Sequence, residues 1–130
     1  MADATQRYAV GQHDTRPWGE WLVVDAGPGF VVKRITVRPG QRLSLQRHRY
    51  RDERWVVVAG TAQVTLDGAA FPLGPGEATH IARGSAHRVA NRGVDDVVFI
   101  EVQTGSMLSE DDIERLDDDY GRAETGSSGS

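Results

Sequence analysis

The chain has 130 residues, of which 38% are hydrophobic and 26% charged, with a formal net charge of −4 at pH 7 and no cysteine. These values fit one globular domain that can bury a core without disulfides, and they exclude a disulfide scaffold, a thiolate metal site and a cysteine nucleophile. No apolar run is long enough for a membrane span or a signal peptide, so we expect a cytoplasmic protein with no membrane partner.

Short segments separated by glycine and proline turns make up most of the chain after a polar leader, which we assign to residues 1–14. Most of these segments alternate between apolar and polar residues or are rich in β-branched residues, as strands are. Strands are predicted over residues 19–24, 30–38, 42–48, 53–59, 61–67, 77–82, 86–91 and 97–103. Many short strands at this spacing predict an all-β sandwich or barrel.

A single short helix is predicted near the C-terminus. Ser109 followed by Asp112 resembles a capping box, and acidic residues fill the next turn, where a helix dipole favours them. The helix should cover residues 110–116. The domain should extend over residues 15–122 and end in a flexible tail at 123–130.

The charges are unevenly distributed along the chain. Residues 33–54 contain eight lysines and arginines against two acidic residues, whereas residues 110–119 contain seven acidic residues and one arginine. A basic stretch inside an acidic protein favours a small anionic ligand over a nucleic acid, which usually requires a basic domain. We therefore expect no nucleic-acid partner.

Side chains with metal-binding chemistry fall on the predicted strands. Alternation within 42–48 places Gln46 and His48 on the same face, about 7 Å apart along the strand. Glu53 shares a mostly apolar strand face with Trp55, where an unpaired carboxylate is costly, and His87 opens a later strand. Imidazole, carboxylate and amide oxygen suit a divalent zinc, manganese, iron, nickel or cobalt ion. One strand histidine alone is more often an ordinary polar residue, so the prediction depends on the whole spacing.

Two blocks of residues carry a resemblance to a known family. The first block contains Gly40, Gln46, His48, Glu53 and Gly60, and the second contains Gly76, Ala82, His87 and Asn91. Their spacing resembles the two signature motifs of the cupin superfamily, with Gln46 in place of the usual first histidine and Ala82 in place of the usual proline. The runs PGQRLSLQRHRYRDERWVVVAGTAQVTLDG, RPWG and IEVQTGSMLSEDDIERLDDDYGR resemble the type II mannose-6-phosphate isomerases. This resemblance implies an all-β cupin double-stranded β-helix, which is a jelly-roll barrel, with a short C-terminal helix.

The resemblance also implies roles for individual residues. The metal ligands would be Gln46, His48, Glu53 and His87, which would hold one divalent ion, with zinc as first choice over cobalt, manganese, nickel or iron. Arg51 matches an arginine important for activity, and Lys33, Glu101 and Gln103 match further family positions. Lys33 and Glu101 lie on largely apolar strand faces and are the two candidates for a general base, between which the sequence does not decide.

A sugar phosphate would be held by the cationic stretch that includes Lys33, Arg34 and Arg51. Gln103 and His80 are further candidates for substrate binding, although His80 faces either the cavity or solvent. We expect Lys33 to lie in the barrel mouth, paired with an anion or with Glu101.

The resemblance implies a stand-alone isomerase domain that interconverts mannose 6-phosphate and fructose 6-phosphate through an enediol. In the family this domain often follows a mannose-1-phosphate guanylyltransferase domain, for which the chain has neither a signature nor room. A metal-dependent dioxygenase and a non-catalytic sugar-phosphate-binding cupin are the alternatives. Val32, Val56 and Val58 are expected to point outward, which predicts a homodimer because exposed β-branched faces favour burial.

Overall fold

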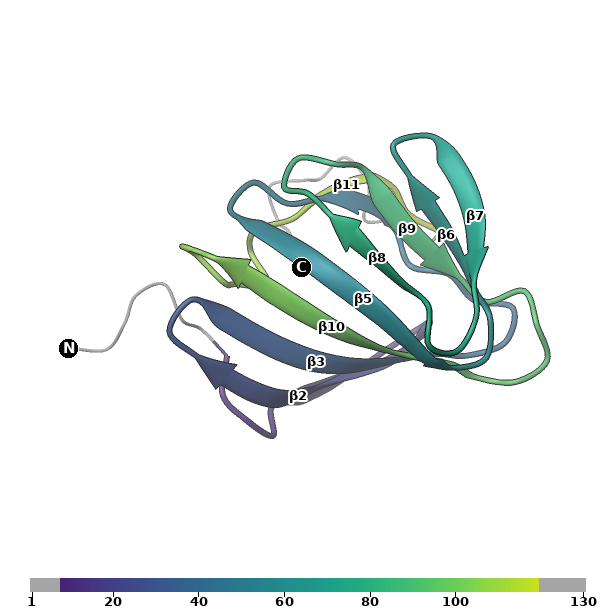
Figure 1. Ribbon diagram of the computed structural model, residues 1–130, viewed down its shortest axis with the longest axis horizontal. Coiled ribbons are helices and arrows are strands. Elements are labelled where there is room, and N and C mark those ends of the chain that lie inside the picture. The colour runs from purple at the N-terminus through teal and green to yellow at the C-terminus, as the bar shows by residue number, and fades with distance from the viewer. Residues whose placement is uncertain (1–7, 120–130) are drawn as a thin grey trace.

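The computed structural model describes residues 8–119, which form two antiparallel sheets that face each other (Figure 1). One sheet has six strands in the order β1-β2-β3-β10-β5-β8, and the other has five in the order β11-β4-β9-β6-β7. The strands are β1 (His13–Arg16), β2 (Gly19–Gly27), β3 (Phe30–Val37), β4 (Leu45–Arg47), β5 (Arg51–Ala59), β6 (Ala62–Leu66), β7 (Ala69–Leu73), β8 (Ala78–Ile81), β9 (His87–Ala90), β10 (Val97–Gly105) and β11 (Glu114–Asp117). This arrangement confirms the predicted all-β jelly roll. The described residues include no helix long and apolar enough to cross a membrane.

All eight predicted strands are present, although the one predicted over 42–48 is reduced to β4, and Arg42 makes only an isolated bridge with Ala90. The strands β1, β7 and β11 were not predicted. The turn between β6 and β7 has positive φ at Asp67 (48°) and Gly68 (87°), as a tight hairpin requires. Pro72 argues against a strand in the sequence, but β7 is an edge strand, where a missing N–H group is tolerated.

The predicted helix over 110–116 is wrong. Ser109 does accept hydrogen bonds from the following turn, at Oγ from the Asp111 N–H (3.1 Å) and at its carbonyl from the Asp112 N–H (3.1 Å). The Asp112 carboxylate, however, accepts the N–H groups of Arg49 and Tyr50 (2.8 and 2.9 Å), which ties the segment to the loop before β5. The chain then pairs with β4 as β11. A seven-residue helix is marginal, so this pairing at a sheet edge prevails.

Residues 8–14, which we assigned to the polar leader, pack against the barrel. Tyr8 is 5% exposed and belongs to the core, and Gly11 and Gln12 exchange backbone hydrogen bonds with Val23 (2.8 Å each). The predicted tail at 123–130 and the predicted domain end at residue 122 lie outside the described residues.

The space between the sheets holds an apolar core at one end and polar side chains at the other. Val31, Val57, Val64, Val89 and Phe99 are among the fully buried core residues. The same inward alternation on β3, β5 and β10 also buries charged and polar side chains, namely Lys33, Arg51, Glu53, Glu101 and Gln103. Buried charges must be paired, so these residues mark the interior site.

The outer face of the six-stranded sheet carries exposed valines. Val56 is 36% exposed and Val58 is 50% exposed, while Val32 is half-buried. Their outward direction agrees with the sequence analysis, and the homodimer stays a prediction. Arg34 and His80 are exposed, on strands whose neighbouring residues Lys33 and Ile81 are buried, so they also lie on the outside.

Candidate functional site

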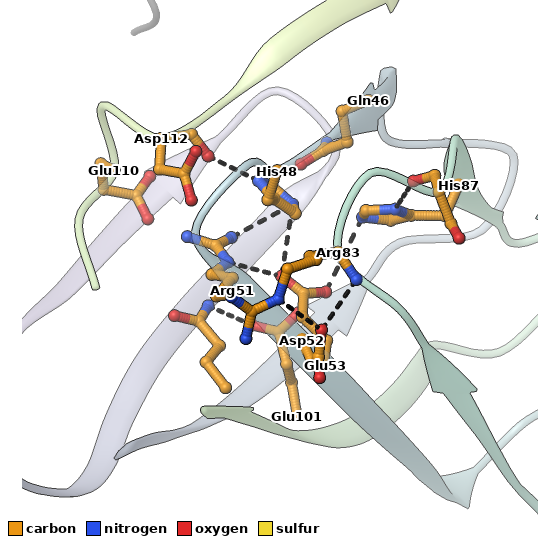
Figure 2. Close-up of polar contacts among 12 residues, drawn as sticks. Gln46, His48, Arg51, Asp52, Glu53, Arg83, His87, Glu101, Glu110 and Asp112 are labelled. Atoms are coloured by element: carbon orange, nitrogen blue, oxygen red, sulfur yellow. Dashed lines mark hydrogen bonds and ion pairs between the residues drawn. The ribbon is translucent and has the colours of Figure 1, made fainter. Parts of the chain in front are cut away.

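Three buried side chains converge between the two sheets (Figure 2). His48 Nε2 lies 3.2 Å from Glu53 Oε2, and His87 Nε2 lies 3.7 Å from Glu53 Oε1. One potential ligand atom from each of the three residues lies within 4.8 Å of the others, and all three residues are at most 3% exposed. The predicted ligands His48, Glu53 and His87 are therefore brought together.

The strands place these side chains by simple alternation. Glu53 is the third residue of β5, where every second side chain points inward. His87 begins β9 and is paired in register with Gln46 of β4, so the two strands that carry these predicted ligands are neighbours. His48 follows β4 directly, on the same side as Gln46. The close spacing of Gln46, His48 and Glu53 in the sequence thus becomes one cluster across the two sheets.

Backbone carbonyls fix the tautomer of both histidines. His48 Nδ1 lies 2.6 Å from the carbonyl oxygen of Asp112, and His87 Nδ1 lies 3.0 Å from that of Ser85. A carbonyl only accepts, so each Nδ1 donates and each Nε2 presents a lone pair. Burial lowers the pKa of His48 to about 3 and also lowers the pKa of His87, so both rings are neutral.

This donor set fits a divalent metal ion. Two neutral Nε2 atoms face the oxygens of an ionised carboxylate, an arrangement that a cation between them would stabilise. Hydrogen bonding of the second ring nitrogen to a carbonyl is what protein metal sites use to orient histidine ligands. Gln46 Nε2 donates to Ser44 Oγ (2.9 Å), which leaves its amide oxygen for a ligand role, and Figure 2 shows its side chain extending toward His48.

Arg51 is part of this cluster and not a solvent-exposed loop cation. It is 6% exposed, its Nε donates to Glu53 Oε2 (2.8 Å), and its guanidinium also contacts His48 Nε2 (3.2 Å). Trp55 Nε1 donates to the other oxygen of Glu53 (3.1 Å). Burial would raise the pKa of Glu53, but His48, which becomes charged only in acid, and the permanently charged Arg51 outweigh it and hold the pKa well below the usual range. Glu53 is therefore ionised.

Glu101 lies next to this cluster in a different electrostatic state. Its Oε1 accepts from Trp55 Nε1 (3.2 Å), and its Oε2 accepts from Gln103 Nε2 (2.7 Å). Burial, together with the negative charge of Glu53, raises the pKa of Glu101 to about 8. Gln103 is fully buried, and its Oε1 has no hydrogen-bond partner among the described residues. A buried carboxyl group with a raised pKa beside a candidate metal site is suited to moving protons.

Lys33 is paired with an anion, as predicted, and that anion is Glu110. Lys33 Nζ donates to Glu110 Oε2 (2.8 Å) and to the hydroxyl of Tyr8 (3.2 Å). It also lies 4.3 Å from the centroid of the Tyr8 ring and 4.4 Å from that of Trp21. A carboxylate and two aromatic faces all stabilise the charged ammonium. Glu101 is the register partner of Lys33 on β10, but no direct hydrogen bond joins the two side chains.

Two small cavities adjoin the cluster. One, of about 20 Å³, lies between Glu53, His87 and Glu101; the other, of about 70 Å³, contains Lys33, Arg51 and Glu101 in its wall. Gln46 and Glu101 line both. The predicted substrate-binding residues Arg34 and His80 are outside this group because their side chains lie on the outer face of the sheet.

The sequence analysis missed two cations of the larger cavity, Arg16 and Arg115. Arg16 stands in the RPWG run that carries part of the family resemblance, which was the only signal for it. Arg115 was assigned to a helix, where its inward direction could not be seen. Pairing of β11 with β4 places it opposite Gln46.

Stability in acid should depend on Glu110. Although burial raises its pKa, the nearby Lys33 ammonium and its hydrogen bonds outweigh this and lower the pKa of Glu110 to about 2 from an ordinary 4.5. A depressed pKa stabilises the fold above pH 4.5, and this contribution is lost as pH falls toward 2. We expect Glu110→Gln to be less stable than the wild type at pH 7, with a gap that narrows below pH 4.5. Urea unfolding of both proteins across this range measures the gap, and a gap independent of pH would contradict the assignment.

Comparisons with known proteins agree with this geometry. A family model described as mannose-6-phosphate isomerase C-terminal matches residues 3–118. The chain is 57% identical over 107 residues to the alginate biosynthesis protein AlgA of Pseudomonas aeruginosa, which covers 82% of this chain and 22% of that protein. It is 48% identical over 121 residues to a mannose-1-phosphate guanylyltransferase of Escherichia coli, which covers 93% of this chain and 25% of that protein. The chain thus spans a quarter or less of the length of these relatives.

A solved structure gives the same fold. A sugar phosphate isomerase from a cupin superfamily, from Silicibacter pomeroyi, superposes with a TM-score of 0.60 at 25% sequence identity, over 65% of this chain and 58% of that one. The jelly roll described above is therefore a cupin fold. The family match extends over nearly all of the described residues and includes every residue of the His48, Glu53 and His87 cluster. This chain belongs to the mannose-6-phosphate isomerase C-terminal family.

Proposed function

We propose that this chain is a metal-dependent aldose–ketose isomerase that interconverts mannose 6-phosphate and fructose 6-phosphate. The observation that supports this most directly is a buried carboxyl group, Glu101, which Trp55 and Gln103 hold beside a ligand set fit for a divalent cation. The description of the matched family and the sugar-phosphate isomerase among the solved structures point to the same substrate class.

His48, Glu53 and His87 would hold the ion, with the amide oxygen of Gln46 as a fourth ligand. Zinc is our first choice, with cobalt, manganese, nickel and iron as alternatives that the same ligands accept. When bound, the ion would supply Lewis-acid stabilisation of negative charge that develops on the sugar oxygens. The protein keeps its two histidine ligands in one tautomer through Asp112 and Ser85.

Proton transfer falls to Glu101. In the forward direction its carboxylate would take the proton from C2 of the open-chain mannose 6-phosphate and return it to C1, while the hydroxyl proton of O2 passes to O1, with an enediol in between. We assign the base to Glu101 and not to Lys33, because Lys33 Nζ is already engaged in hydrogen bonds to Glu110 Oε2 and the Tyr8 hydroxyl. Trp55 and Gln103 donate to the two oxygens of Glu101 and so hold the carboxyl group in one orientation.

The cavity wall favours an anionic substrate. Four cationic side chains line it, Arg16, Lys33, Arg51 and Arg115, against the two carboxyl groups of Glu101 and Glu110. Charged hydrogen-bond donors of this kind bind phosphate strongly. The aromatic side chains of Trp18 and Trp21 also line this cavity.

Phosphorus NMR tests this proposal directly. The metal-loaded chain is incubated with mannose 6-phosphate or, separately, with fructose 6-phosphate. The isomerase proposal predicts that both samples reach the same ratio of the two sugar phosphates without oxygen uptake. Oxygen consumption that depends on added iron would indicate a dioxygenase. Binding of the sugar phosphate without conversion would indicate a non-catalytic cupin. Either result would overturn the proposal.

A further inference from the structure

The larger cavity contains a carboxylate where its cations would receive an anionic ligand. We propose that Glu110 holds the place of the substrate phosphate, that Arg16 and Lys33 form the phosphate subsite, and that the incoming anion displaces the Glu110 side chain. The identification of the anion as a sugar phosphate rests on the proposed function, whereas the displacement itself is a property of these residues.

The contacts of Glu110 are those that a phosphate group would make. Its Oε2 accepts from Lys33 Nζ (2.8 Å) and from the hydroxyl of Tyr8. Its Oε1 forms an ion pair with the guanidinium of Arg16 (3.5 Å). One ammonium, one guanidinium and one hydroxyl thus converge on a single anion, a donor set that matches the several acceptor oxygens of a phosphate.

Lys33 cannot be left without an anion. Its side chain is 4% exposed, and a buried ammonium without a partner is costly. Glu110 satisfies it in the free protein, and a phosphate would satisfy it in the complex. An exchange of one anion for another therefore preserves the pairing of Lys33 throughout, which makes the displacement cheaper than the opening of an uncompensated site.

The small size of the cavity favours such an exchange. Its volume is about 70 Å³ with Glu110 in place, whereas small-molecule pockets are typically about 300 Å³ or larger. The Glu110 side chain is 34% exposed, so it can rotate toward solvent. Asp112, two residues further on, stays fixed by its bonds to Arg49 and Tyr50 and keeps its carbonyl on His48. Figure 2 shows Glu110 and Asp112 on the same side of His48, opposite His87. The movement of Glu110 therefore leaves the metal ligands in position.

Titration calorimetry with inorganic phosphate tests the inference on the full chain after removal of metal by a chelator, so that no bound ion contributes. Glu110→Gln removes the competing charge while it keeps the shape of the side chain. We expect it to bind phosphate about tenfold more tightly than the wild type, because the charged carboxylate that competes with phosphate for Lys33 and Arg16 is gone. Arg16→Gln should bind phosphate more weakly than the wild type.

Glu114→Gln is the matched control. It makes the same charge change on the same segment, but Glu114 is exposed and pairs with Arg47 outside the cavity (2.8 Å). It should leave phosphate affinity unchanged. An equal gain in phosphate affinity in Glu110→Gln and Glu114→Gln would show that the gain comes from the change in overall charge, and it would overturn the inference. Unchanged or weaker binding by Glu110→Gln, or unchanged binding by Arg16→Gln, would overturn it as well.

Thermal unfolding provides a second readout that does not depend on a strong calorimetric signal. Phosphate should raise the unfolding temperature of Glu110→Gln more than that of the wild type, because at a given concentration a tighter ligand stabilises the folded state more. Both measurements use neither sugar nor metal. Failure of the isomerase proposal would therefore appear as absent turnover with this pattern of phosphate binding intact, whereas failure of the present inference would appear in the binding pattern alone.

Discussion

Replacement of Glu53 by glutamine is expected to abolish tight binding of a divalent metal ion. Glu53 is the one ionised carboxylate among the three clustered residues, and it contacts both histidines. Loss even of an outer-shell partner typically costs about 10–100-fold in metal affinity, so loss of this charged ligand should cost more. Metal content after dialysis against a limiting zinc buffer measures the effect, and isomerase activity should be lost with it.

The control for this variant is Asp52→Asn, which removes a carboxylate one residue earlier on β5. Asp52 points outward and contacts Arg83, so metal binding should be unaffected. Loss of Glu53 also leaves Arg51 without its ion-pair partner, so unfolding of each metal-free variant is followed to confirm that it is folded. A folded Glu53→Gln protein that retains zinc as the wild type does would show that the metal site lies elsewhere.

Replacement of Glu101 by glutamine should reduce kcat by about 10²–10⁴-fold, the typical contribution of a positioned general base. Metal binding should persist, since the proposed ligands His48, Glu53 and His87 remain and the glutamine side chain has nearly the same shape. Steady-state kinetics and metal content on the same samples separate the two effects. This separation distinguishes Glu101 from Glu53, whose replacement should remove both.

The pH profile gives a further readout for Glu101. The carboxylate form is the active base, so the wild-type kcat/KM should rise with pH through the pKa of Glu101, which burial and Glu53 have raised. This rising limb should be absent from the residual activity of Glu101→Gln. The Glu114→Gln variant, which changes an exposed residue, should retain both the wild-type rate and the rising part of the pH profile. A Glu101→Gln enzyme with the wild-type rate and profile would assign the proton transfer to another group.

Local patterns, together with the family resemblance, were sufficient to predict the framework of the fold and the convergence of the residues proposed as metal ligands. Alternation placed Gln46 and His48 on one face and Glu53 inward, and these positions depend only on the two-residue period of a strand. His87 could be added because the spacing of two motifs resembled that of a known superfamily. The structure brings His48, Glu53 and His87 together and places Gln46 next to His87 in the sheet.

The features that the sequence analysis did not predict depend on contacts between segments far apart in the sequence. The segment 110–117 has a local preference for a helix, but its pairing with β4 and the bonds of Asp112 to residues 49 and 50 determine its structure. Glu110 therefore reaches Lys33, 77 residues away, and Arg115 turns inward. Arg34 was assigned to substrate binding from its place in a basic run, which does not reveal the face of the sheet that a residue occupies. For His80 the sequence left both faces open, and the structure places it on the outer one.

The conversion of mannose 6-phosphate to fructose 6-phosphate by the chain, first stripped of metal with a chelator and then reloaded with single metals, tests the central claim most directly. The isomerase mechanism predicts that activity disappears with the metal and returns with zinc, cobalt or manganese. Tight binding of these metals without conversion in any reloaded sample would contradict it.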